Sequence, residues 1–219
     1  MNKKIILGVS GSPRKGANTD ILLDVALKAA AENENIETHK IYLRDYEIHN
    51  CVSCYACCQD AAANNGGERA CLIYKDGMDE IYPLLKECDG LIIATPVYFG
   101  SMCAQVKQFM DRTEGLLRYG KSKYQYALQS KVGGAIAVGG NRNAGEEFTL
   151  QAIHYYFHVH DMVVVGAGGE PTPGCYLGGA GTTWPQKGQV RDAVLQDELG
   201  IKSSRNLGIN VAKTLTLMK

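Results

Sequence analysis

The stretch Gly8-Val9-Ser10-Gly11-Ser12-Pro13-Arg14-Lys15-Gly16-Ala17-Asn18-Thr19-Asp20 decides the fold of this chain. It follows an apolar run, Ile5-Ile6-Leu7, and precedes an apolar helical pattern from Ile21, so it predicts a strand, a loop and a helix. The polar groups of the loop belong to Ser10, Ser12, Arg14, Asn18 and Thr19. A helix N-terminus adds unpaired N–H donors and the positive end of the helix dipole, so this loop suits a phosphate.

The loop matches neither of the two best-known phosphate-binding spacings. Gly11 and Gly16 bracket four residues, as in nucleotide triphosphatases, but Ala17 stands where that motif needs a lysine. The dinucleotide spacing Gly-x-Gly-x-x-Gly is also absent. A loop rich in hydroxyls fits a terminal monophosphate, as in FMN, better than a pyrophosphate. The alternative is an ordinary strand-to-helix turn capped by Asn18 or Thr19.

Composition places the chain among ordinary globular proteins. It has 219 residues, 45% of them hydrophobic and 21% charged, with a formal net charge of zero. These values predict a single domain and favour neither nucleic acid nor another polyanion as a partner. No apolar run is long enough to span a membrane, and no signal core is visible, so we expect a cytoplasmic protein. Eight cysteines in a reducing compartment indicate a metal or redox role.

Strand and helix patterns alternate along the chain. The predicted strands cover residues 4–10, 36–43, 90–95, 132–138 and 162–167, and the predicted helices cover 19–33, 78–88, 102–118, 146–160 and 203–218. Pro96 is expected to stop the third strand, and Pro83 to delay or kink the second helix. Strands that are apolar on both faces indicate a parallel sheet covered by helices on both sides.

This pattern predicts one flavodoxin-like α/β domain over residues 1–219, a doubly wound five-stranded parallel sheet of order 2-1-3-4-5. A cysteine-rich insertion loop (49–75) follows the second strand. A tail rich in Gly and Pro (168–202) is a candidate lid or subunit contact. Ligands of such a fold bind beyond the carboxyl ends of strands 1 and 3.

Two further loops follow strands at this edge. Thr95-Pro96-Val97-Tyr98-Phe99-Gly100-Ser101 offers flat aromatic surface and backbone amides, the pairing that a planar heteroaromatic ring needs. Its alternative is a turn with two core aromatics. Gly139-Gly140-Asn141-Arg142-Asn143-Ala144-Gly145 follows strand 4 and could cover the far edge of the same ligand, or be a surface loop.

The spacing Cys51-x-x-Cys54-x-x-Cys57 wraps three thiols around one point, which suits an iron–sulfur cube. Zinc sites more often use two separated Cys-x-x-Cys pairs, and the sequence has no second pair. The alternative is a loop of reduced thiols without a cluster. Cys58 is adjacent to Cys57, which makes it difficult for both to reach the same cube.

At these loops the sequence resembles the NAD(P)H-dependent FMN reductase family. The motifs that carry the resemblance are Gly11-Ser12-Pro13-Arg14-Lys15-Gly16-Ala17-Asn18-Thr19, Thr95-Pro96-Val97-Tyr98-Phe99-Gly100-Ser101 and Gln105-Val106-Lys107-Gln108-Phe109-Met110-Asp111-Arg112. Within that family the chain looks most like the iron–sulfur flavoprotein branch, because of the cysteine spacing and Cys71-Leu-Ile-Tyr-Lys-Asp-Gly-Met78. The resemblance covers residues 4–165 and implies a flavodoxin-like fold that binds FMN.

The resemblance also implies the site residues. The phosphate and ribityl chain would be held by Ser10, Ser12, Arg14, Asn18 and Thr19, the ring by Pro96, Val97, Tyr98, Phe99 and Gly100, and its other edge by Gly140 and Asn141. Cys51, Cys54, Cys57 and Cys71 would bind a 4Fe-4S cluster. The branch places its fourth cysteine a few residues after the third, whereas here twelve residues, 59–70, separate Cys71 from Cys58. Whether Cys71 or Cys58 is the fourth ligand stays open at this point.

We therefore expect an FMN-dependent oxidoreductase, with no catalytic side chain assigned. Electrons would come from NAD(P)H or a ferredoxin-like donor and pass to a small acceptor such as a quinone or a flavin. The family implies a homodimer or homotetramer, and the cysteine loop, predicted at the sheet edge, would serve a flavin in another subunit. The alternatives are a non-enzymatic electron carrier and a zinc-bearing interaction module.

Overall fold

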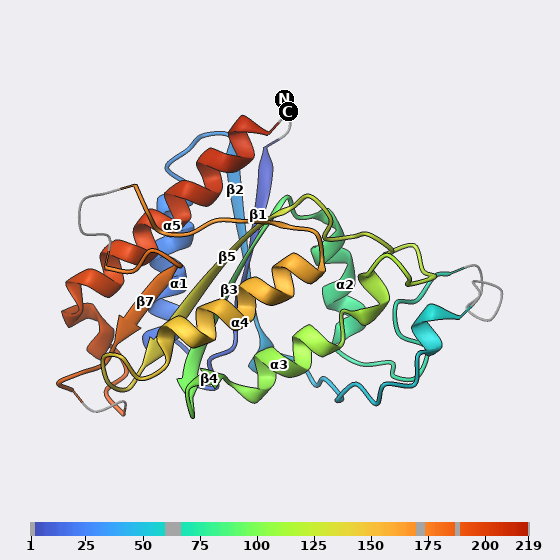
Figure 1. Cartoon of the computed structure of the whole chain (residues 1–219), viewed down its shortest axis with the longest axis horizontal. Coiled ribbons are helices and arrows are strands. Elements are labelled where there is room, and N and C mark those ends of the chain that lie inside the picture. The colour runs from blue at the N-terminus through green and yellow to red at the C-terminus, as the bar shows by residue number, and fades with distance from the viewer. Residues whose placement is uncertain (1–2, 60–66, 170–173, 187–188, 219) are drawn as a thin grey trace.

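The computed structural model describes residues 3–59, 67–169, 174–186 and 189–218. A mostly parallel sheet runs through its centre (Figure 1). Its main path is β2 (Ile36–Tyr42), β1 (Lys4–Ser10), β3 (Gly90–Tyr98), β5 (Val132–Gly139) and β6 (Val163–Val164). The two other strands are β4 (Ser101–Met102), antiparallel to β3, and β7 (Gly179–Thr182), parallel to β5. The predicted parallel α/β architecture is confirmed.

The prediction of five strands is wrong in detail, because the described residues form a seven-stranded sheet. The strand predicted over residues 162–167 shortens to β6, which pairs with the start of β5. The chain then leaves the sheet, and Ala167 donates its N–H to the carbonyl of Tyr176 at 3.0 Å. It returns as β7, within the stretch predicted as loop, and pairs with the second half of β5. Two short strands thus share the place of the predicted fifth strand.

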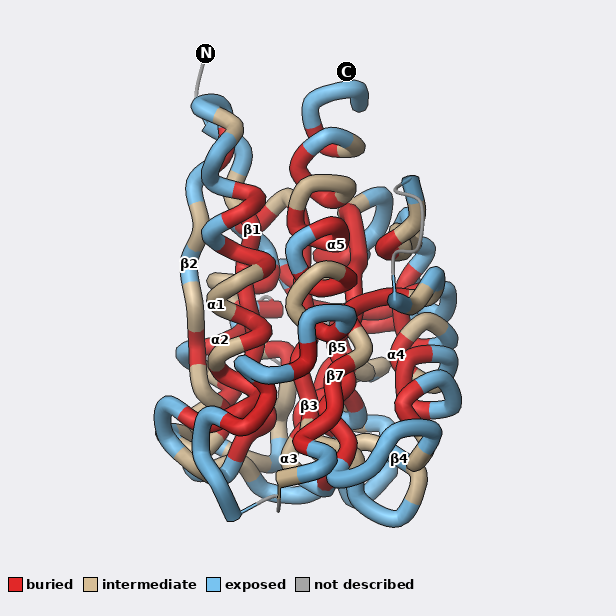
Figure 2. The backbone as a smooth tube through the Cα atoms, turned by 90° about the vertical axis from the view of Figure 1, so that its left-hand side faces the viewer, coloured by how far each residue is buried: buried red, intermediate tan, exposed pale blue. Residues whose placement is uncertain are grey.

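Helices cover both faces of the sheet. On one face lie α1 (Asn18–Ala30) and α5 (Glu198–Leu217), and on the other α2 (Met78–Glu87), α3 (Ala104–Asp111) and α4 (Glu146–Val159). Successive residues of a strand point to opposite faces, so Leu91 and Ile93 join one core cluster, and Ile92 joins the other. Figure 2 shows β3 and β5 buried along most of their length, whereas the edge strand β2 alternates with exposed residues.

Pro96 does not stop its strand, as the sequence predicted. β3 continues to Tyr98, with Pro96 paired opposite Val138 of β5. On the other side β1 ends opposite Ala94, so no strand there needs the N–H that a proline lacks. The extension carries the chain into a tight hairpin in which Tyr98 pairs with Ser101 of β4.

The predicted helix over residues 102–118 is also interrupted. It forms α3 and then the short 3-10 helix η4 (Glu114–Leu116). At the break, the hydroxyl of Thr113 donates to the carbonyl of Met110 at 2.7 Å, which competes with the regular helical ladder. Further 3-10 turns are η1 (Leu43–Asp45), η2 (Ala56–Cys58) and η5 (Ala193–Gln196). Within the described residues, no helix combines the length and apolar character needed to cross a membrane.

Candidate functional site

Four segments meet at the carboxyl edge of the sheet, where the sequence predicted the ligand. They are the phosphate loop (residues 11–17), the β3–β4 hairpin, the loop that follows β5 and the segment that follows β7. The second and third approach closely, because a Cβ on Gly145 would lie 2.5 Å from the Cα of Gly100. The fourth packs on the others: Thr183 donates its N–H to Gly139 at 3.0 Å. The predicted loops therefore lie together.

A buried carboxylate, Asp20, organises the phosphate loop from the first turn of α1. It is 1% exposed and accepts hydrogen bonds from the hydroxyl of Ser10 at 2.5 Å and the N–H of Gly16 at 2.7 Å. Arg44 of η1 lies 3.0 Å from it as an ion pair and also donates to the carbonyl of Ser12 at 3.0 Å. Sequence reasoning missed Asp20 and Arg44, although an acidic residue in the first helical turn after a hydroxyl-rich loop was a visible signal.

Of the predicted phosphate ligands, Arg14 is partly buried and the others are buried, and Ser12 and Asn18 take part in shaping the loop. The Ser12 hydroxyl donates to the carbonyl of Arg14 and accepts from its N–H, at 3.0 and 3.2 Å. The amide of Asn18 donates to Val190 at 2.8 Å and accepts from the N–H of Val194 at 3.0 Å. Asn18 thus fixes the tail segment beside the loop. Direct contact of these side chains with a phosphate stays a prediction.

The backbone of these loops borders open space at three glycines. A Cβ built on Gly16, Gly100 or Gly140 meets nothing within 4 Å, so a ligand can approach the main chain at each. Gly11 differs, since a Cβ there would lie 2.2 Å from Val106 of α3. Its bare backbone lets the loop pack on that helix. An open cradle of main chain and hydroxyls fits the phosphate and ring edge of FMN.

The hairpin presents its aromatic residues to solvent. Tyr98 is 48% exposed and Phe99 fully exposed, so the alternative of two core aromatics is wrong. Phe99 and Gly100 have φ angles of 51° and 74°, which defines a tight turn that twists with the strands. A non-glycine residue in this region is strained, and such strain gathers at functional sites. Asn141, on the neighbouring loop, is exposed.

A second feature lies beside the ends of α3 and α4. A cavity of about 450 Å³ is lined by the thiol-bearing residues Cys51, Cys54, Cys57 and Cys71. Cys58 is not among the described residues that line it. Within the described part of the chain, no three side chains of His, Cys, Asp or Glu lie close enough together to hold a metal ion. The four thiols thus line one cavity without converging on a point, and thiols are the donors that an iron–sulfur cluster takes.

The thiols themselves are unequal. Cys51 and Cys54 are exposed, whereas Cys57 and Cys71 are partly buried. Burial is the larger cause and the neighbouring Cys58 the second that raise the pKa of Cys57 to about 12. The sulfur atoms of Cys57 and Cys58 lie 3.8 Å apart. Of the long insert between Cys58 and Cys71, residues 60–66 lie outside the described residues.

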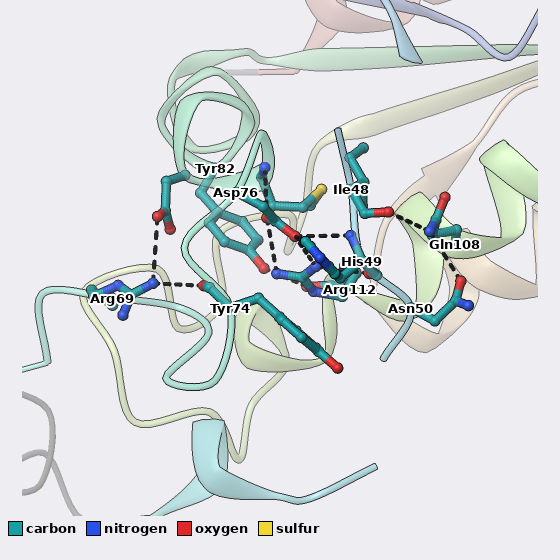
Figure 3. Close-up of polar contacts among 11 residues, drawn as sticks. Ile48, His49, Asn50, Arg69, Tyr74, Asp76, Tyr82, Gln108 and Arg112 are labelled. Atoms are coloured by element: carbon teal, nitrogen blue, oxygen red, sulfur yellow. Dashed lines mark hydrogen bonds and ion pairs between the residues drawn. The ribbon is translucent and has the colours of Figure 1, made fainter. Parts of the chain in front are cut away.

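A buried ion pair holds the two ends of the cysteine loop together (Figure 3). Arg112, just after α3, contacts both carboxylate oxygens of Asp76, at 2.6 and 3.2 Å. Both side chains are almost fully buried, with 2% and 3% exposed. Arg112 also donates to the carbonyl of His49 at 2.8 Å, and the ring of His49 stacks on Tyr74 at 4.7 Å. Segments 48–50 and 74–76 are thereby fixed to the same arginine.

This ion pair gives a physical role to two motifs that carried the family resemblance. Arg112 ends the motif over residues 105–112, and Asp76 lies in the motif that begins at Cys71. Gln108, in the first of these motifs, donates to Ile48 and to the side chain of Asn50. Both motifs therefore position the cysteine loop, a function that the sequence alone did not reveal.

The far wall of the cavity contains a buried histidine. His160 follows α4 and its Nε2 lies 2.9 Å from the hydroxyl of Thr113. Burial lowers the pKa of His160 to about 4, so the ring is neutral near pH 7. Tyr156 packs edge-on against it, with ring centres 4.7 Å apart.

A mostly parallel α/β sheet with its ligand loops after β1 and β3 defines the flavodoxin-like class. In agreement, the fold is similar to the solved structure of RosB with a bound 8-demethyl-8-formylriboflavin-5'-phosphate intermediate. The TM-score is 0.67 at 17% identity, over 98% of this chain and 80% of that chain.

The chain belongs to the NADPH-dependent FMN reductase family, which matches residues 5–169, and is accordingly a flavin oxidoreductase. It is 42% identical over 214 residues to an iron–sulfur flavoprotein of Methanocaldococcus jannaschii, covering 98% of both chains. It is also 42% identical over 161 residues to an iron–sulfur flavoprotein of Methanosarcina thermophila, covering 74% of this chain and 76% of that one. The family predicted from the sequence is confirmed.

Proposed function

We propose that this flavin oxidoreductase uses FMN to pass electrons from NAD(P)H or a ferredoxin-like donor to a small acceptor such as a quinone or a flavin, in the cytoplasm. The observation that carries the proposal is the meeting of three predicted ligand loops at one sheet edge, with main chain open to a ligand at Gly16, Gly100 and Gly140. When bound, FMN would supply the hydride and single-electron chemistry.

The chain's own residues bind and orient this cofactor. The phosphate loop, with Arg14 and the start of α1, would hold the phosphate through hydroxyls and N–H groups. The hairpin at Tyr98 and Phe99 would give the ring an apolar surface, and the backbone N–H groups of residues 97–100 would stabilise negative charge that develops on it. The exposed loop at Gly140 and Asn141 would line the other edge.

We further propose that Cys51, Cys54, Cys57 and Cys71 hold a 4Fe-4S cluster, which supplies one-electron transfer when bound. The common cavity of these four residues supports Cys71 as the fourth ligand over Cys58. The names of the two archaeal relatives support a cluster in this branch.

The flavin edge and the cysteine cavity lie at opposite ends of α4. Gly145 precedes this helix at the flavin edge, and Val159, its last residue, lines the cavity. A helix of 14 residues is about 21 Å long. We therefore propose that the cluster of one subunit serves the flavin of another, in a homodimer or homotetramer. The exposed apolar side chains of Phe148 and Tyr155, 74% and 73% exposed on the same helix, support a subunit contact there.

The test is an anaerobic absorption spectrum of the purified protein before and after dithionite, combined with FMN titration and metal analysis. We expect flavin bands, a broad cluster shoulder, and iron and acid-labile sulfide in equal amounts. Protein that stays colourless and takes up no FMN would refute the proposal. Zinc without sulfide would indicate the interaction module instead.

Steady-state assays distinguish an enzyme from a carrier. We expect turnover with NAD(P)H or reduced ferredoxin and a quinone. Electron exchange with ferredoxin without turnover of any acceptor would favour the non-enzymatic electron carrier.

A further inference from the structure

We propose that the buried Asp20–Arg44 pair makes the site selective for a phosphorylated flavin over riboflavin, by setting the charge and shape of the phosphate loop before the ligand binds. The inference rests on the proposed FMN site. Neither residue is needed to touch the flavin, so both are positioning residues. Three observations carry the inference.

The first observation is that the carboxylate of Asp20 lies inside the loop that would receive the phosphate. Its two oxygens accept from Ser10 before the loop and Gly16 within it, so one side chain fixes both ends of the turn. A buried carboxylate shapes the loop well, but its negative charge would repel a phosphate dianion. Such a site can bind phosphate only if that charge is neutralised.

The second observation is that Arg44 supplies the neutralising charge. Its side chain is only 10% exposed, and it lies 3.0 Å from Asp20. The guanidinium also stacks on the ring of Tyr42 at 4.0 Å, which holds it in place. Because β2 is the neighbour of β1 in the sheet, the turn that follows β2 places Arg44 beside the loop that follows β1.

The third observation is that Arg44 binds the loop backbone directly, through the carbonyl of Ser12. The arginine therefore contacts the loop at two points, the Ser12 carbonyl and the Asp20 carboxylate. Loss of its charge would leave the fold of the loop partly intact but expose the phosphate to an unpaired carboxylate. Riboflavin, which has no phosphate, would not experience this repulsion.

Arg44→Gln tests the charge argument. We expect its affinity for FMN to fall about 100-fold, since a dianion near an unpaired carboxylate in a partly buried site is repelled by several RT. Its affinity for riboflavin should change less than about threefold. Both are measured by quenching of flavin fluorescence on titration of apoprotein.

The double variant Asp20→Asn, Arg44→Gln separates charge from structure. It lacks both members of the pair, so a purely structural role predicts weaker FMN binding than in Arg44→Gln. The proposal predicts the reverse: removal of the negative charge restores at least about tenfold of the lost FMN affinity. If Arg44→Gln does not fold, Arg44→Lys takes its place: it keeps the charge but not the guanidinium fork, so it should lose less than about tenfold in FMN affinity.

A matched control lies one helical turn away. Lys40 and Asp24 also join β2 to α1 as an ion pair, but are more exposed and do not touch the loop. Lys40→Gln should leave the affinities for FMN and riboflavin unchanged. Equal losses of both flavins in Arg44→Gln, or no recovery in the double variant, would overturn the inference. A parent protein that binds no FMN would overturn the proposed function instead.

Discussion

Two buried arginine–aspartate pairs serve two different loops in this molecule. Arg44–Asp20 holds the phosphate loop, and Arg112–Asp76 holds the ends of the cysteine loop. Around Asp20 the loop is complete, because Ser10, Gly16 and the Ser12 carbonyl all have partners there. Arg112 instead fixes only the two ends of the cysteine loop, and the thiols between them surround a space without converging. The phosphate loop is therefore fixed along its length by its own contacts, whereas the cysteine loop is fixed at its two ends.

The largest effect we predict concerns the thiols of the cysteine loop and the cluster proposed there. Cys71→Ser should abolish the cluster, because it removes one of the four thiols that line the cavity. Cys58→Ser should retain it. Iron and acid-labile sulfide per chain are the measurement, and FMN content is the internal control, because the proposed flavin site lies at the other end of α4. Cluster loss in Cys58→Ser and retention in Cys71→Ser would show that Cys58, and not Cys71, is the fourth ligand.

The next effect concerns the pair that fixes the ends of the cysteine loop. Asp76→Asn would leave the Arg112 guanidinium buried without a countercharge, a change that costs about 3–5 kcal/mol in buried pairs. We expect urea unfolding to show a loss in this range, with reduced cluster content and unchanged FMN content. Asp79→Asn is the control. Its pair with Arg69 is about one-third exposed, so the variant should lose less than about 1 kcal/mol in free energy of unfolding.

The same pair makes stability depend on acid. Burial alone would raise the pKa of Asp76, but hydrogen bonds from Arg112 and from two backbone N–H groups outweigh it and lower the pKa to about 2. The carboxylate therefore contributes stability above about pH 4, which is lost as the pH falls toward 2. Asp76→Asn should lack this decline, which amounts to about 2 kcal/mol. An equally steep decline in the variant would contradict the assignment.

A second acid-dependent loss of stability is expected from His160 on the wall of the same cavity. Its pKa is lowered to about 4 by burial, so below about pH 6.5 the unfolded chain takes up a proton that the folded chain refuses. The free energy of unfolding should fall by about 3 kcal/mol in total between pH 6.5 and 4, at a nearly constant slope of about 1.4 kcal/mol per pH unit. His160→Gln should flatten this part of the urea-unfolding profile, and His158→Gln, at an exposed position of α4, should not.

The sequence predicted the repeating architecture and the flavin edge because these depend on local patterns. Each of these patterns can be identified within a short segment: the apolar strands, the hydroxyl-rich loop and the cysteine spacing. The partners of Asp20 and Asp76 could not be predicted in this way, since each aspartate pairs with an arginine from a distant segment. The same reason applies to the partners of Asn18, Val190 and Val194, which lie far from it in the sequence. The split fifth strand depends on a return of the chain at β7, and a strand of two glycines, one alanine and one threonine gives too weak a signal to reveal it.

The smallest effect we predict concerns the backbone strain at Phe99 in the β3–β4 hairpin. Phe99 is fully exposed with a φ of 51°, a conformation that Asn adopts more readily. Phe99→Asn should therefore stabilise the fold by about 1 kcal/mol and, because it removes the apolar surface proposed for the ring, weaken FMN binding. Tyr126→Asn is the matched control, an aromatic residue 47% exposed at a φ of 58° outside the proposed flavin loops, which should gain stability without a change in FMN affinity. If both variants bind FMN as the parent does, Phe99 does not contact the flavin, and the proposed ring-binding role of the hairpin is wrong.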